Sequence, residues 1–212
     1  MLSGAVIGAV VGLVVALVML AQRKGSHAQR LKALGQQGPA AARLVLDRQI
    51  PPAREIALNK ILDQRERMAW LALLGDVPAL ERELAAHQGK LTGVVQTNAM
   101  ALLGIAVRSA PEQRAAVAAR LDELAARIEA EGGRLLALVK KKTRALAVLA
   151  HGMTGVAMPP AEQVVIQELC RELGAVGLLV TWAFGEALQA TGQTAQAQAM
   201  FAMVRRSTSA FG

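Results

Sequence analysis

The chain of 212 residues is 53% hydrophobic but only 2% aromatic, carries a formal net charge of +8 and contains one cysteine. Abundant Ala and Leu with few aromatic residues favour helices over sheets, and a lone cysteine excludes an intramolecular disulfide. The excess of positive charge is confined to residues 22–50 and 133–156, which disfavours a general nucleic-acid binder because the rest of the chain is close to neutral.

The first element is an uncharged, apolar run from Leu2 to Ala21, in which Ser3 is the only polar side chain. A helix of this length spans about 30 Å, the thickness of the hydrocarbon core of a bilayer, so residues 1–21 are predicted to form a transmembrane anchor. A cleaved signal peptide is a weaker alternative, because no basic side chain precedes the run and Met19 is too large for the cleavage site. A buried soluble helix is weaker too, since a terminal helix that is apolar on every side has little domain to pack against.

Glycines recur every four residues within this run, at Gly4, Gly8 and Gly12. A stripe of small residues lets two transmembrane helices approach closely, although glycine is common in transmembrane helices in general. Self-association into a homo-oligomer through this stripe is therefore an alternative role for the anchor.

Basic side chains follow the apolar run directly, at Arg23, Lys24, Arg30 and Lys32. Flanks rich in Lys and Arg remain on the cytoplasmic side, where they also bind anionic lipid headgroups. The sequence therefore predicts a single-pass protein of the inner (cytoplasmic) membrane, with its N-terminus outside and its C-terminal domain in the cytoplasm. Residues 22–52 are predicted to form a basic juxtamembrane linker that contacts membrane lipid.

Residues 53–208 are predicted to form one all-α domain of helical hairpins. Apolar side chains recur there at helical spacing between short turns, and the expected helices span residues 53–74, 77–88, 91–108, 111–131, 134–151, 160–173, 175–191 and 193–206. Pairing these helices gives units that begin near residues 53, 91, 134 and 175. Such a period is typical of stacked α-hairpins, in which each pair buries its apolar face on the next.

Local sequence signals support these predicted helix boundaries. Asp76 precedes Val77-Pro78 as a helix start, and Ser109 with Glu112 forms a predicted capping box. The longest irregular stretch, residues 151–160, is predicted to be a loop that places Met153 and Met158 in the core, with an adaptable contact surface as the alternative role of the two methionines.

Residues 181–204 carry the clearest hairpin pattern. Phe184-Gly185 and Leu188 lie on its first helix, Gly192 in its turn, and Ala197 and Phe201 on its second helix. The pattern resembles a tetratricopeptide repeat, although Val204 replaces an alanine and the terminal proline is missing. The resemblance implies a superhelical scaffold whose concave face binds peptides or proteins. Earlier hairpins share only the outline of the repeat.

Two groups of side chains are candidates for binding a partner protein. The first group shares one side of a predicted helix, in a stretch without acidic residues, and consists of Lys140, Lys141 and Arg144. The second group lies on the first helix of the repeat-like hairpin, toward the expected groove, and consists of Trp182, Glu186 and Gln189. The alternatives are a solvated outer face or a bilayer contact for the basic group and core packing for the tryptophan. Nucleic acid is the least favoured partner, because no aromatic residue interleaves with these cations.

No motif in the sequence points to catalysis. His27, His87 and His151 are far apart and lack metal-ligand spacing, and Cys170 is predicted to be a small buried thiol. The chain is therefore predicted to be a non-enzymatic, membrane-anchored scaffold, without metal or cofactor, that holds a partner protein near the membrane. The alternatives are a structural membrane component that oligomerises through its glycine stripe and a membrane-attached enzyme, which would need a ligand-sized pocket with converging polar groups.

Overall fold

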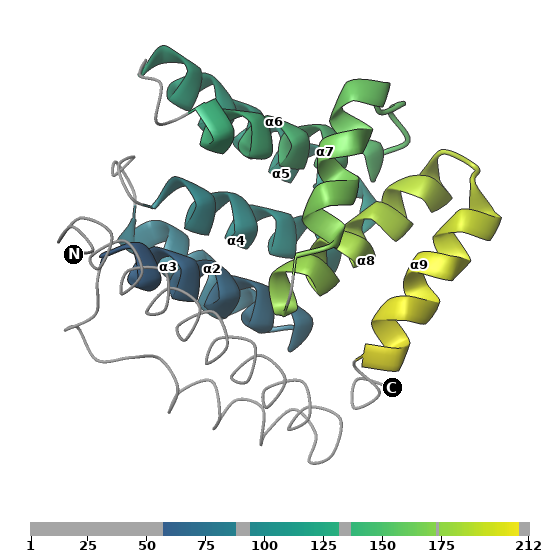
Figure 1. Ribbon diagram of the computed structural model, residues 1–212, viewed down its shortest axis with the longest axis horizontal. Coiled ribbons are helices and arrows are strands. Elements are labelled where there is room, and N and C mark those ends of the chain that lie inside the picture. The colour runs from purple at the N-terminus through teal and green to yellow at the C-terminus, as the bar shows by residue number, and fades with distance from the viewer. Residues whose placement is uncertain (1–56, 88–93, 132–136, 173, 208–212) are drawn as a thin grey trace, which may run out of the picture.

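The computed structural model describes residues 57–87, 94–131, 137–172 and 174–207. Every element in these ranges is an α-helix, as the all-α prediction requires, and each helix expected after residue 53 has a counterpart. The helices are α2 (Ala57–Leu73), α3 (Val77–Ala86), α4 (Val95–Arg108), α5 (Pro111–Ala130), α6 (Ala137–Gly152), α7 (Pro160–Cys170), α8 (Ala175–Ala190) and α9 (Thr194–Ser207) (Figure 1).

The predicted anchor at residues 1–21 and linker at 22–52 lie outside the described residues. The same holds for the residues assigned to them: Gly4, Gly8, Gly12, Arg23, Lys24, Arg30 and Lys32. Among the helices that the structure does describe, none is long and apolar enough to cross a membrane.

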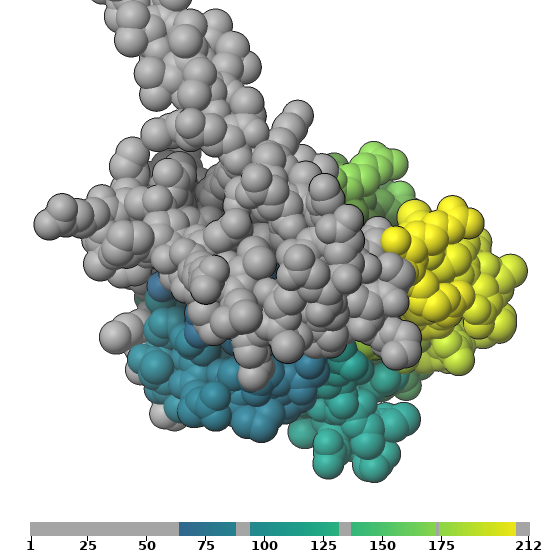
Figure 2. Space-filling model, turned by 90° about the horizontal axis from the view of Figure 1, so that it is seen from below, coloured from purple at the N-terminus to yellow at the C-terminus, as the bar shows by residue number. Residues whose placement is uncertain are grey.

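Helix α8 lies at the centre of the described helices. Its sequence, AVGLLVTWAFGEALQA, is apolar on almost every side, and it contacts α2, α4, α6, α7 and α9. A helix that is apolar all round belongs in a core, which explains this position. Figure 1 shows α2, α4 and α6 stacked beside one another, with α7 and α8 crossing them and α9 at one end. Figure 2 shows, from below, the α2–α3 hairpin and α9 at opposite sides of the described surface.

The contact between α2 and α8 distinguishes this arrangement from an array in which only neighbouring hairpins touch. It joins the first hairpin directly to the fourth. The reason is the composition of α8, which has apolar surface to bury on more than one side.

Of the two predicted helix starts, one is confirmed and the other is wrong. Asp76 is the N-cap of α3, and its Oδ1 accepts a hydrogen bond from the backbone N–H of Ala79 at 3.1 Å, as predicted. The capping box at Ser109 is wrong, because Ser109 ends α4 and its Oγ donates to the carbonyl of Ile105. Ala110 takes the N-cap position of α5 with extended backbone, which a residue before proline prefers.

Met153 and Met158 are buried, as predicted.

Two glycines allow helices to approach closely. A Cβ atom on Gly104 of α4 would lie 2.6 Å from the Cβ of Ala72 in α2. A Cβ atom on Gly185 of α8 would lie 2.7 Å from Cε1 of Phe201 in α9. Both distances are far below an ordinary carbon–carbon contact of about 3.5–4.0 Å, so a larger side chain would push the helices apart.

A buried carboxylate fixes the beginning of α8. Glu66 of α2 is only 3% exposed, and its Oε1 accepts hydrogen bonds from Trp70 Nε1 and from the backbone N–H of Ala175, both at 3.0 Å. Gly174 occupies the N-cap of α8 and has no side chain that could accept this bond. A negative charge from another helix therefore satisfies an N–H at the positive end of α8.

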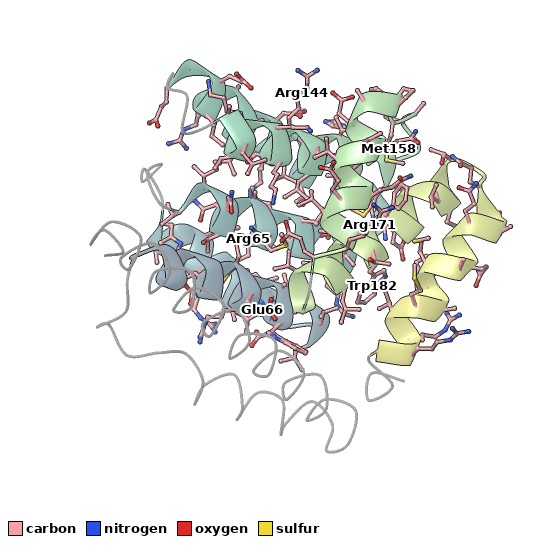
Figure 3. All side chains as sticks on the ribbon, viewed as in Figure 1. Arg65, Glu66, Arg144, Met158, Arg171 and Trp182 are labelled. Atoms are coloured by element: carbon pink, nitrogen blue, oxygen red, sulfur yellow. The ribbon has the colours of Figure 1, made fainter. Side chains whose placement is uncertain are left out.

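The neighbouring side chains form an ion-pair network across three helices and the segment that leads into α8. Arg65 is buried, donates to Gln96 Oε1 at 2.9 Å and pairs with Glu172, which follows α7. Lys142 of α6 pairs with the same carboxylate, with its Nζ 2.7 Å from Oε1. Figure 3 labels Arg65 and Glu66 on α2, in the middle of the helices. Because a buried charge is costly without a partner, this network fixes how α2, α6 and the start of α8 are positioned.

Replacing Gly104 by alanine tests the close contact between α2 and α4. Alanine in an exposed helix is about 1 kcal/mol more favourable than glycine, so a free site would be stabilised. Here we expect Gly104→Ala to lower the free energy of unfolding by about 1–3 kcal/mol, because the new methyl group has no room. Urea unfolding of the full-length protein measures the change. A stabilised Gly104→Ala variant would contradict the packing.

Replacing Glu66 tests the acceptor at the start of α8. Glu66→Ala leaves two donors without an acceptor, each of which costs about 1–3 kcal/mol, so we expect a loss of about 2–6 kcal/mol in unfolding free energy. Glu66→Gln keeps an acceptor oxygen and serves as the matched variant, with a smaller expected loss. Equal losses in the two variants would show that the hydrogen bonds at this position are unimportant.

Candidate functional site

A hollow of about 270 Å³ opens between α8, α9 and the end of α2. Its lining residues define what we call the α8–α9 groove: Leu73, Trp182, Glu186, Gln189, Phe201, Val204 and Arg205. The three side chains from α8 are spaced by four and three residues, which places them on one side of the helix. The second predicted group, Trp182, Glu186 and Gln189, is therefore brought together in one hollow.

Trp182 forms one wall of the groove. Its ring is half-buried, and the guanidinium carbon of Arg108 lies 4.4 Å from the ring centroid, a distance typical of a cation–π interaction. Arg108 also donates from Nε to the carbonyl of Ala72 at 2.8 Å and from Nη2 to that of Leu73 at 2.5 Å. Burial lowers the pKa of the Arg108 guanidinium. Its positive charge thus rests on the last carbonyls of α2, where a helix dipole attracts cations.

Glu186 is held in place by two partners. Its Oε1 accepts a hydrogen bond from the indole Nε1 of Trp182 at 3.2 Å, and its Oε2 lies 3.0 Å from Nη2 of Arg114 in α5. The indole orientation is therefore fixed by an acid whose charge Arg114 already balances. Gln189 and Arg205 are exposed on the rim, and the described part of the chain offers Arg205 no acidic partner.

The first predicted group does not join this groove. Lys140, Lys141 and Arg144 lie on α6, and Figure 3 shows Arg144 at the edge of the described helices, away from Trp182. Lys140 Nζ is 3.5 Å from Glu129 Oε2, and Arg144 Nε is 3.3 Å from Glu162 Oε1. The expectation that no acid offsets these cations was wrong, because α5 and α7 bring carboxylates beside α6. Such exposed pairs are worth little, and Lys141 stays exposed.

A second hollow, of about 300 Å³, lies between α3, α4 and α5 and has a more polar lining. Across it, Arg120 donates two hydrogen bonds to the carboxylate of Glu81, at 3.0 and 3.1 Å. His87 Nδ1 and Asn98 Oδ1 are buried there, and no described residue is a hydrogen-bond partner of either atom. Water can satisfy such atoms in a polar hollow of this size.

Among the described residues, no group of His, Cys, Asp and Glu is arranged to hold a metal ion. Cys170 is half-buried, and burial raises the pKa of its thiol, which makes it a poor nucleophile.

Sequence reasoning missed three groups that shape the α8–α9 groove. Leu73 and Arg108 come from α2 and α4, and Arg114 comes from α5. No spacing in the sequence links them to Trp182, because their proximity depends on how the helices pack.

No protein-family model matches the chain, and neither a curated protein nor a solved structure is significantly similar to it. The tetratricopeptide-like pattern of residues 181–204 therefore stays a prediction. Within that segment, α8 and α9 form a hairpin with Gly192 in its turn and with Ala197 fully buried.

The Glu81–Arg120 pair predicts a pH dependence of stability. Hydrogen bonding to Arg120 lowers the pKa of Glu81 below its ordinary value of 4.5. The stabilisation is present above the unfolded pKa and is lost as the pH falls through the folded pKa. Between about pH 6 and pH 3, wild type should therefore lose more unfolding free energy than Glu81→Gln. Glu168→Gln, at an exposed position on α7, is the control that should behave like wild type. Identical curves for wild type and Glu81→Gln would refute this role.

Proposed function

We propose that this protein is a membrane-anchored helical scaffold that binds a partner protein through the α8–α9 groove. The observation that carries the proposal is the groove wall, in which the half-buried rings of Trp182 and Phe201 stand beside buried Leu73 and Val204. Tryptophan and arginine are the residues most often found at the energetic centres of protein interfaces. Both are present here, with Arg205 on the rim.

The size of the groove supports a protein side chain as its occupant. Pockets for small molecules and cofactors usually enclose about 300–1,000 Å³, and this hollow of about 270 Å³ is smaller. Its polar side chains are also largely committed, since Glu186 already accepts from Trp182 and pairs with Arg114. We therefore propose a binding role for this groove and no enzymatic one.

The predicted anchor at residues 1–21 supplies the second half of the proposal. A protein confined to a membrane surface meets its neighbours at a high effective concentration, so one modest groove suffices to hold a partner. Lys141 and Arg144, exposed on α6, are proposed as a second contact, either with the partner or with anionic lipid. Lys140 is a weaker candidate, because its side chain is only 18% exposed beside Glu129, whereas that of Arg144 is 69% exposed although it pairs with Glu162.

Photo-crosslinking in native membranes tests this proposal. A photoreactive residue replaces Gln189 on the groove rim, and a second variant carries it at Ala126, which is exposed on α5. We expect a protein adduct at position 189 only, weakened about tenfold or more by Trp182→Ala, because an interface hot spot is worth about 2 kcal/mol or more. Circular dichroism checks that Trp182→Ala folds. Adducts that are equal at both positions, or insensitive to Trp182, would contradict the proposal.

The alternative is a structural membrane component that oligomerises through Gly4, Gly8 and Gly12. Crosslinking of the Gly8→Leu and Gly12→Leu double variant separates the two functions, since leucine blocks close helix approach. If homo-oligomers disappear while the position-189 adduct persists, the groove acts independently of the glycine stripe.

A further inference from the structure

The floor of the α8–α9 groove is apolar and concave. Leu73 and Val204 are buried, and Trp182 and Phe201 each offer part of an aromatic face. A concave apolar floor of about 270 Å³ accommodates a protruding apolar side chain. A bilayer surface, by contrast, is best bound by apolar side chains that project outward from the protein. The shape therefore favours a peptide segment over a lipid surface.

The charge around this floor is positive. Other partly buried cations of the described helices have carboxylate partners: Arg65 and Lys142 pair with Glu172, and Arg114 pairs with Glu186. Within the described residues, Arg108, behind Trp182, is bonded to backbone carbonyls and to the ring and to no carboxylate. Arg205 stands exposed on the rim, followed by exposed Arg206. Since Arg114 balances Glu186, two arginine charges at the groove have no acidic partner in the described part of the chain.

This chain's own linker does not complement the groove. Residues 22–50 carry six basic side chains and one acidic one, so they repel a positive rim. A complementary occupant carries the opposite charge, which selects against wrong partners and steers the right one. A segment of another protein with acidic side chains is thus a better occupant than the linker.

We infer that the α8–α9 groove takes an acidic amphipathic segment of the partner, in which a bulky apolar side chain enters between Trp182 and Phe201 while flanking carboxylates face Arg205. This inference rests on the proposed function and adds the chemistry of the partner. Arg108 contributes from behind the ring, where its charge is poorly screened because it is partly buried.

Selection of displayed random peptides on the full-length protein in detergent micelles tests this inference. We expect enriched sequences with Asp or Glu on both sides of Phe, Leu or Trp, and loss of their binding in Trp182→Ala. In a synthetic copy of an enriched peptide, replacing the acids by amides should weaken binding and so raise the measured Kd about tenfold or more. Added salt should weaken the binding of the acidic peptide but not that of its amide copy.

A charge-reversed variant supplies the sharpest arm of the experiment. Arg205→Glu should remove the preference for acidic peptides and favour basic ones. Arg82→Glu, which makes the same charge change at an exposed position on α3, should leave the preference unchanged. Circular dichroism confirms that both variants are folded.

The remaining outcomes separate the inference from the proposed function. Peptides that require Trp182 for binding but show no preference for acidic residues would overturn the inference and leave the proposed scaffold function standing. If no peptide binds through Trp182, both fail. Binding of phosphatidylserine vesicles that depends on Arg205, without peptide binding, would replace the protein partner by a lipid surface.

Discussion

The fold depends on the burial of α8 on nearly all its sides. Eleven of its residues are buried, from Ala175 to Leu188, and five other described helices contact it. Each fully buried Val, Leu or Phe contributes about 1.5–3 kcal/mol, so this one helix supplies a large part of the apolar burial of the fold. Its backbone amides at the start must also be satisfied away from water, and Glu66 of α2 accepts one of these hydrogen bonds.

Central burial explains where the candidate site lies. Trp182, Glu186 and Gln189 occupy the one side of α8 that the other helices leave partly open, between α9 and the end of α2. Helix α9 packs mainly on α8, whereas α8 is fixed by several neighbours and by the ion pairs around Glu172. Among the described helices, one wall of the groove is therefore held by several neighbours and the other mainly by α8, which suits the adaptable surface that the proposed partner segment requires.

The sequence predicted the positions of the helices much better than it predicted which helices lie side by side. Apolar periodicity located each helix, and Asp76 marked a start, because both are signals within one turn or one face. Ser109 failed as a cap since Pro111 forced the preceding Ala110 into extended backbone. Trp182, Glu186 and Gln189 could be grouped because they share one helix. Their partners Arg108, Arg114 and Leu73, like the acids beside Lys140 and Arg144, come from other helices that sequence spacing does not relate to them.

The central position of α8 is tested most directly by amide hydrogen exchange of the full-length protein, read by mass spectrometry. Amides in a helix buried on all sides exchange only when the whole fold opens, whereas those of a peripheral helix exchange through local opening. The account predicts the slowest exchange in α8 and distinctly faster exchange in α9. Exchange in α8 as rapid as in α9 would contradict it, because α8 would then not be the helix on which the others pack.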